Sequence, residues 1–167
     1  MTTKPAFETL VELHSGELFG YLWRLLGDEA EARDCLQETF LRAFRAYGRL
    51  RNFEHLRAWL YKIATNTART QLARNHRRQR LTVGPLEALP SGERAVDVQV
   101  AERTQLAAVK RAVQALPERQ RAALLLRKYQ ELEYAEIAAT LGCSETAARA
   151  NVYQALKKLR ALFQDED

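Results

Sequence analysis

The sequence is poor in the residues that build disulfide frameworks and metal sites. Its only cysteines, Cys35 and Cys143, stand far apart, without a C-x-x-C pair or a nearby pair of histidines. Zinc and redox motifs depend on close cysteine and histidine spacing, so this pattern excludes the usual ones. We expect two reduced thiols that pack as small apolar side chains, although the sequence leaves open whether either senses oxidants.

Long apolar runs are also absent. No window approaches the roughly 18 uninterrupted apolar residues that a membrane span requires, and the first eight residues, MTTKPAFE, lack the apolar core of a signal peptide. The sequence therefore predicts a cytoplasmic protein without membrane insertion.

Catalytic motifs are missing as well. The sequence has no glycine-rich phosphate loop and no metal-ligand cluster, and His14, His55 and His76 belong to no Ser/His/Asp constellation. We therefore expect no enzyme, no catalytic residues, no metal and no cofactor.

What the sequence does contain is an uneven distribution of positive charge. The 167 residues carry a net charge of +5. The excess lies in residues 1–80, because residues 81–167 hold as many acids as bases. No acidic residue occurs between Glu54 and Glu87, a stretch that contains seven Lys and Arg residues. Such a block attracts polyanions, but it could equally be a solvated helix face.

Helical periodicity runs through almost the whole chain, and strand signals are nearly absent. We predict an all-α fold of two small helical domains, residues 1–80 and 101–167, joined by a flexible linker at 81–100, where proline and glycine gather. The expected helices are 7–26, 28–50, 56–78, 96–116, 117–130, 134–141 and 144–163. Local signals set several ends: Gly27 closes the first helix, Asp28 and Glu31 form a capping box, and Pro117 occupies a first turn.

The most specific pattern is near the C-terminus. A short amphipathic helix, residues 134–141, is followed by Gly142, which can take the left-handed conformation that ends a helix. Ser144 can cap the longer helix that follows. Helix, glycine turn and helix form the helix-turn-helix pattern of many DNA-binding proteins, although many two-helix corners share this spacing.

The third predicted helix has two unlike faces. Leu56, Leu60, Ile63, Ala64, Thr67 and Gln71 lie on one side at 100° per residue. The opposite side mixes cations, an amide and a hydroxyl without a carboxylate: Lys62, Asn66, Arg69, Thr70, Ala73 and Arg77. A solvated helix usually alternates charge signs, so this face favours contact with phosphates. Trp59 projects toward it and either stacks on an unpaired base or anchors the edge of the core.

The last predicted helix divides in the same way. Its expected inward residues are Ala148, Val152, Ala155, Leu156 and Leu159, and its outward residues are Thr146, Ala147, Ala150, Asn151, Gln154 and Lys157. Asn and Gln amides match the donor and acceptor pair that adenine presents in the major groove. Arg149 and the lysines would hold phosphates, whereas the alternative is a surface helix with incidental polar residues.

Several of these segments resemble a known family. The run DCLQETFLRAF at residues 34–44 is similar to the D-x-x-Q-E-x-F signature of sigma region 2, and WLYKIATN at 59–66 is similar to the run that follows it. LPERQR at 116–121 and the segment 134–156 resemble region 4. With these two regions around a linker, the chain resembles an extracytoplasmic-function (ECF) sigma factor of bacterial RNA polymerase.

The resemblance implies partners and site residues. The partners would be promoter DNA, core polymerase (its β′ clamp helices and β flap) and an anti-sigma factor. Core polymerase would be bound by Asp34, Gln37, Glu38, Phe40 and Leu41. The minus-ten element would be melted and read by Arg51, Asn52, Phe53, Trp59, Lys62, Asn66, Arg69, Thr70 and Arg77, with Phe53 stacking on a flipped base and Asn52 bonding to it. The minus-thirty-five element would be read by Thr146, Ala147, Arg149, Ala150, Asn151, Gln154 and Lys157.

Some positions depart from the family pattern. Glu133 stands where Ser or Thr is usual before the helix-turn-helix, and Arg149-Ala150-Asn151 replaces the common Lys-Ser-Arg of the recognition helix. The hypothesis that follows is a preference for adenine through Asn151 and Gln154. Two other functions remain open: a stand-alone helix-turn-helix regulator that binds duplex DNA as a dimer, and an adaptor that uses the fold only for protein contact.

Overall fold

The computed structural model describes residues 3–81 and 99–164, and every secondary-structure element within these ranges is an α-helix. The order is α1 (Phe7–Leu26), α2 (Glu29–Tyr47), α3 (Leu56–Leu81), α4 (Gln99–Ala115), α5 (Glu118–Lys128), α6 (Tyr134–Leu141) and α7 (Glu145–Gln164). The predicted all-α class is confirmed. The predicted linker falls mostly on residues 82–98, outside the described ranges.

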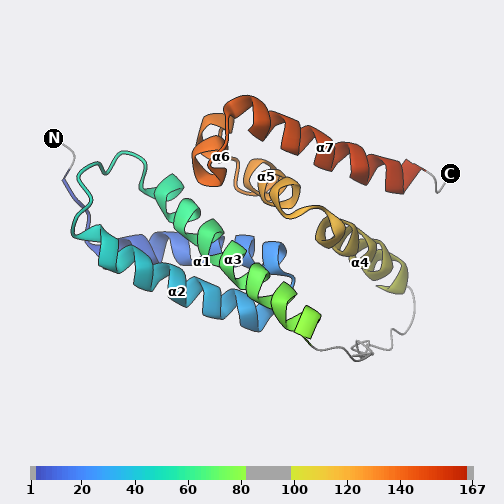
Figure 1. The fold of residues 1–167 in the computed structure, drawn as a ribbon, viewed down its shortest axis with the longest axis horizontal. Helices are drawn as coiled ribbons and strands as arrows, with labels where there is room; N and C mark the ends of the chain where they lie inside the picture. The colour runs from blue at the N-terminus through green and yellow to red at the C-terminus, as the bar shows by residue number, and fades with distance from the viewer. Residues whose placement is uncertain (1–2, 82–98, 165–167) are drawn as a thin grey trace.

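The helices form two groups (Figure 1). The first three, α1, α2 and α3, pack together, and α5, α6 and α7 form the second group with α4 beside them. We call these groups the N-terminal bundle and the C-terminal bundle. They lie against each other, with α3 on α6 and α1 on α5, and one cluster of buried apolar side chains, from Leu18 of α1 to Val152 of α7, runs through both.

Local capping explains where most helices begin and end. Gly27 takes φ 75° and closes α1 as predicted, and Gly142 takes φ 65° after α6. The Asp28 carboxylate accepts a hydrogen bond from the Glu31 backbone N–H at 2.9 Å, and the Ser144 hydroxyl accepts one from Ala147 at 3.0 Å. These bonds satisfy donors that the first turn of a helix leaves unpaired.

Two details of the predicted capping were wrong. Glu31 does not reach back to Asp28, because its carboxylate accepts instead from the Asn75 amide of α3 at 3.0 Å. Pro117 is the residue before α5, with extended ψ of 143°, and not part of its first turn. The Pro117 carbonyl accepts a hydrogen bond from the Arg121 N–H at 2.9 Å, so Pro117 is the N-cap residue of α5.

The bounds of other helices also differ from the prediction, and α5 ends at Lys128 instead of near Gln130. Helix α2 ends at Tyr47, three residues early, because the N–H groups of Arg49 and Leu50 bond to carbonyls three residues back in a tighter turn. Helix α3 continues to Leu81 instead of ending near Arg78.

The glycine at the helix-turn-helix corner offers a test of this local geometry. We expect Gly142→Ala to lower the free energy of unfolding by about 1–2 kcal/mol, because a Cβ in the left-handed region is strained even where the space around it is open. Gly16→Ala, inside α1 with equally open space, should instead stabilise by up to about 1 kcal/mol. Urea unfolding followed by circular dichroism measures both, and equal effects of the two substitutions would contradict the role of the positive φ.

Candidate nucleic-acid interface

The polar face predicted on α3 is largely open to solvent. Lys62, Asn66, Thr70, Ala73 and Arg77 are exposed or half-buried, whereas the opposite face is packed in the N-terminal bundle. The Asn66 side chain makes no hydrogen bond to any residue that the structure describes, so its amide is available to a ligand. Helix α3 therefore presents cations, an amide and a hydroxyl together on one accessible surface.

Arg69 is the exception on this face. It is half-buried, and its Nε donates to the Glu118 carboxylate at the start of α5 at 2.8 Å. This cation of the predicted face is therefore already paired with an acid from the C-terminal bundle.

The loop between α2 and α3 holds three of the predicted base-contacting residues. Arg51 and Asn52 are exposed, and the Asn52 side-chain oxygen accepts from the Glu54 N–H at 2.9 Å. Phe53 is half-buried, with the Lys4 ammonium 5.3 Å from the centre of its ring. The local bond fixes the turn and leaves the amide NH₂ of Asn52 available as a donor.

Trp59 is half-buried at the edge of the N-terminal bundle. It packs against the core, and its ring lies 6.2 Å from that of Tyr47, tilted by 40°. This contact matches the second of the two predicted roles, that of a core-edge anchor. Base stacking would be limited to the part of the ring that remains exposed.

The faces of α7 agree with the sequence pattern. Ala148, Val152 and Ala155 are buried and Leu156 and Leu159 are half-buried against the other helices. The outward residues are exposed except Ala147 and Asn151, which are half-buried.

The Asn151 amide donates to the Ala147 carbonyl one turn back at 3.0 Å. The Gln154 side chain makes no such bond to the described residues. Asn151 would have to give up a bond to contact a base, so Gln154 is the more available amide on this surface.

The residues predicted to bind polymerase line one side of α2. Asp34, Gln37 and Leu41 are exposed, and Glu38 pairs with Arg42 at 2.9 Å, an ion pair that lowers the pKa of the Glu38 carboxyl. Phe40 is half-buried, packed edge-on against Phe7. Phe44 lies 5.3 Å from Phe7 yet stays largely exposed. This side of α2 thus combines acids with exposed apolar side chains.

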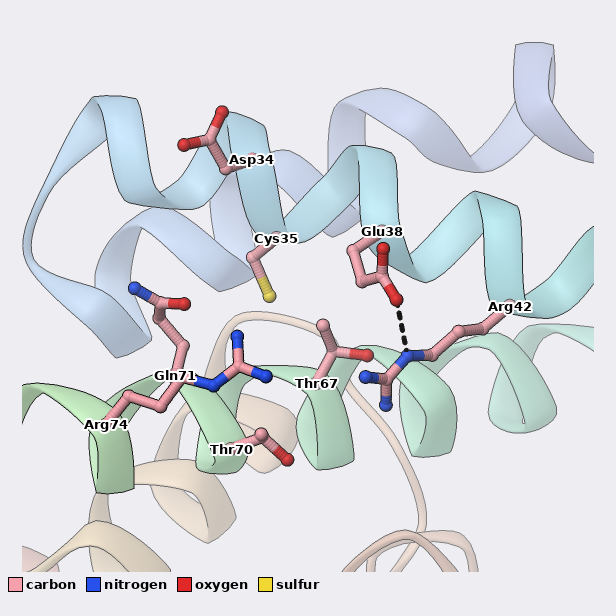
Figure 2. Close-up of a pocket in the computed structure, with 8 residues that line it drawn as sticks. All are labelled: Asp34, Cys35, Glu38, Arg42, Thr67, Thr70, Gln71 and Arg74. Atoms are coloured by element: carbon pink, nitrogen blue, oxygen red, sulfur yellow. Dashed lines mark hydrogen bonds and ion pairs between the residues drawn. The ribbon is translucent and has the colours of Figure 1, made fainter.

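A pocket of about 340 Å³ joins the surfaces of α2 and α3. Figure 2 shows the Glu38–Arg42 pair at one end and the Arg74 side chain reaching across from α3. The residues that line the pocket are Asp34, Cys35, Glu38, Arg42, Thr67, Thr70, Gln71 and Arg74. The mixed charges suit contact with another macromolecule better than capture of a small anion, since two carboxylates would repel one.

The Cys35 thiol at this pocket should be inert. Burial raises its pKa to about 12, and only the thiolate reacts rapidly. We expect a disulfide reagent at pH 8 to modify Cys143, which is half-buried, well before Cys35. Absorbance at 412 nm with Ellman's reagent measures this, with the urea-unfolded protein as control. Two thiols reacting at the unfolded rate would contradict the burial of Cys35.

One polar cluster was not anticipated from the sequence. Glu17 of α1 accepts from Arg57 at 2.9 Å, from the Tyr61 hydroxyl at 3.0 Å, and pairs with His14 at 2.6 Å. Burial raises the pKa of Glu17, but the hydrogen bonds from Arg57, His14 and Tyr61 outweigh it and leave the pKa lowered. No local pattern signals this cluster, because Arg57 and Tyr61 are about 40 positions from Glu17.

Within the described residues, no group of three His, Cys, Asp or Glu side chains is placed to hold a metal ion. No helix within the same residues is long and apolar enough to cross a bilayer.

Two family models match the chain. Residues 10–78 match sigma-70 region 2, and residues 106–159 match sigma-70 region 4. The first covers the N-terminal bundle and the second most of the C-terminal bundle.

Two curated relatives match over most of their own length. RNA polymerase sigma-H factor of Pseudomonas aeruginosa is 32% identical over 169 residues, which cover 96% of this chain and 88% of the relative. ECF RNA polymerase sigma-E factor of Salmonella typhimurium is 31% identical, with 91% and 83% covered.

Solved structures share the fold. Sigma factor RpoE from Bartonella quintana, solved in complex with the anti-sigma factor NepR, superposes with a TM-score of 0.73 at 22% identity, over 96% of this chain and 98% of that one. CnrH, solved in complex with the cytosolic domain of CnrY, gives 0.68 at 26% identity, over 96% and 89%.

Proposed function

The chain belongs to the ECF RNA polymerase sigma factors, and we propose that it directs core polymerase to promoters by reading two DNA elements. The accessible α3 face and the α2–α3 loop would bind the minus-ten element, and the outward face of α7 would bind the minus-thirty-five element. As a sigma factor, the protein acts in transcription initiation, and the catalysis belongs to the polymerase.

The observation that carries this proposal is the presence of two separate DNA-suited surfaces in one chain. The α3 face offers Lys62, Asn66 and Thr70 to solvent without a carboxylate among its outward positions. The α7 face offers Gln154 and Lys157 on a helix-turn-helix. A stand-alone regulator would explain α7 but not α3, and an adaptor that binds only protein would need neither.

Each unit would have its own task. We propose residues 1–80 as the unit that binds polymerase and melts the minus-ten element, and residues 101–167 as the unit for the minus-thirty-five element. Melting would follow from selective capture: Phe53 and the α3 face bind the unpaired strand, and this binding shifts the population toward the open promoter.

Polymerase would dock on α2. Asp34, Gln37 and Leu41 are exposed on one side of this helix, and Glu38 and Phe40 flank them. We propose the β′ clamp helices as the partner of this side and the β flap as the partner of the C-terminal bundle. An anti-sigma factor is a further proposed partner, supported by the NepR complex of the similar Bartonella factor.

The test is reconstituted transcription. The purified chain is mixed with bacterial core polymerase and a library of genomic fragments, and transcript 5′ ends are mapped. Discrete start sites that require the chain would support the proposal. Specific binding to duplex fragments without polymerase-dependent initiation would overturn it in favour of a stand-alone regulator. Tight polymerase binding without affinity for a melted promoter would favour the adaptor.

A further inference from the structure

The segment before α1 is tied to the end of α2. The Lys4 ammonium donates a hydrogen bond to the Tyr47 backbone carbonyl at 2.6 Å, and the Tyr47 hydroxyl donates one to the Pro5 carbonyl at 2.6 Å. Tyr47 is the last residue of α2 and is 7% exposed, so its ring is anchored in the N-terminal bundle. A cation suits this place, because the C-terminal end of a helix is negative. These bonds hold Lys4 at the end of the bundle where the α2–α3 loop begins (Figure 1).

The same ammonium lies against two aromatic rings. It is 4.4 Å from the centre of the Tyr47 ring and 5.3 Å from the centre of the Phe53 ring. Both distances are within the range in which a cation is attracted to the face of an aromatic ring. Lys4 thus joins a ring that belongs to the N-terminal bundle to a ring that belongs to the α2–α3 loop.

The apolar core does not fix the orientation of Phe53. This ring is half-buried, but it is not among the described side chains that pack against the apolar cluster of the bundle. The bond between the Asn52 side chain and the Glu54 N–H shapes the backbone of the turn and leaves the Phe53 side chain free to rotate. A side chain that is ordered only on binding loses conformational freedom, whereas a ring already held avoids this loss. The contact with Lys4 is therefore suited to prepare Phe53 for stacking.

The charge of Lys4 is not neutralised by an acid. No carboxylate of residues 3–81 and 99–164 forms an ion pair with it, and only one of its three N–H donors is used, on the Tyr47 carbonyl. Such a cation could bind a phosphate of the strand directly or act through Phe53. Because the ammonium already lies between a carbonyl and two rings, the geometry favours action through the ring.

We propose that Lys4 is a positioning residue of the minus-ten site. It holds the Phe53 ring in the orientation in which an unpaired base stacks on it, so the segment before α1 is part of this site. The inference rests on the proposed function, since it assumes that Phe53 stacks on a base of the minus-ten strand. Lys4 differs in this from the cations of the α3 face, whose proposed partners are phosphates.

Three variants test the role of Lys4. Lys4→Met removes the charge and keeps the length of the side chain, and Lys4→Arg keeps a cation that can lie on both rings. Tyr47→Phe removes the hydroxyl that bonds to Pro5 without changing the net charge. The matched control is Lys110→Met on α4, at an exposed position outside both proposed DNA surfaces. Circular dichroism first establishes that each variant keeps the helicity of the parent.

The first measurement is the NMR chemical shift of the lysine ε-methylene protons, which needs no DNA. Protons above the face of an aromatic ring are shifted upfield by its ring current, so those of Lys4 should resonate upfield of those of Lys110. We expect Phe53→Ala to move the Lys4 signals part of the way back, because the Tyr47 ring remains. Lys4 signals at the Lys110 position, or signals that Phe53→Ala does not move, would overturn the proposal.

The second measurement is the affinity of the chain, bound to core polymerase, for a fluorescein-labelled, mixed-sequence single strand of about 20 nucleotides. Anisotropy gives the affinity, with core polymerase alone as the blank. We expect Lys4→Met to weaken binding about two- to fivefold, with recovery in Lys4→Arg. Tyr47→Phe should weaken binding about twofold, because the lost hydrogen bond loosens the segment. Lys110→Met should bind as the parent does, since a distant exposed charge is screened at about 0.15 M salt. Full affinity in Lys4→Met would overturn the proposal.

A double-mutant cycle separates positioning from direct contact with phosphate. If Lys4 acts through the Phe53 ring, Lys4→Met should lose no more affinity than Lys110→Met once Phe53 is replaced by alanine. The same loss with and without the ring would mean that the ammonium contacts the strand itself, which would overturn the positioning role. Unchanged binding by Phe53→Ala alone would contradict the proposed function, whereas the proton shifts test the Lys4 contact without DNA. The two failures can therefore be told apart.

Discussion

Replacing Phe53 and Asn66 together by alanine should lower promoter-specific initiation by on the order of a hundredfold. An aromatic side chain that stacks on an unpaired base contributes about 1–3 kcal/mol, and an amide that reads a base contributes a similar amount. Asn66 is exposed without a side-chain hydrogen bond to the described residues, and Phe53 is half-buried in a loop. The double variant should therefore keep its fold. Quantified transcript 5′ ends with saturating core polymerase measure the effect.

The matched control is Gln79→Ala, which removes an amide from the exposed end of the same helix. It should retain initiation within about twofold, because surface substitutions away from a binding site have small effects. Affinity for core polymerase should be unchanged in both variants, since the proposed docking side is on α2. Unaltered start sites in the double variant would contradict the proposed role of α3 and its preceding loop.

Leu126→Ala should lower the free energy of unfolding by about 2–5 kcal/mol, well beyond the effect of truncating an exposed side chain. Leu126 is fully buried on α5, in the cluster of apolar side chains that runs through both bundles. Its backbone carbonyl also accepts the Leu132 N–H at 3.0 Å, which ties the turn before α6. Since native proteins are stable by about 5–15 kcal/mol, this loss is a large share of the total. Urea unfolding followed by circular dichroism gives the value.

Leu162→Ala is the matched control for this change. Leu162 is on α7 of the same bundle but is 56% exposed, so its truncation should alter the free energy of unfolding by no more than about 0.5 kcal/mol. Similar losses for the two leucines would contradict the burial of Leu126 in the apolar cluster that runs through both bundles.

The helices and their faces followed from local signals. The bounds of α1 and α6 agree with the predicted ranges, and Gly27, Gly142 and Ser144 act as the caps that their residue types suggested. The inward face of α7 was also correct, because a helix with 3.6 residues per turn fixes which side chains share a side. The local prediction failed where a residue distant in the sequence offered a competing hydrogen bond. The Glu31 carboxylate accepts from the Asn75 amide of α3 and does not form the predicted capping bond with the Asp28 backbone.

For the candidate site, too, the sequence predicted which positions face outward but not which partners their side chains have. The spacing of residues predicted the outward positions of α3 and α7, but it did not predict the hydrogen bonds, ring contacts and ion pairs that their side chains make. The Asn151 amide bonds to its own helix, Trp59 packs on Tyr47, and Arg69 pairs with Glu118. Each of these contacts depends on the side-chain conformation, which helical periodicity does not predict.

The sequence by itself determined that this protein is helical, where most of its helices begin and end, and which residues face outward on α3 and α7. These properties depend on neighbours within a few positions. Only the tertiary structure decided that Tyr61 and Thr65 of α3 are buried as well, beyond the apolar face that periodicity predicts. It also decided that Arg57 and Tyr61 meet Gln130 about 70 positions away. Such contacts arise when two bundles bury surface against each other, and no local pattern in either one specifies its partner.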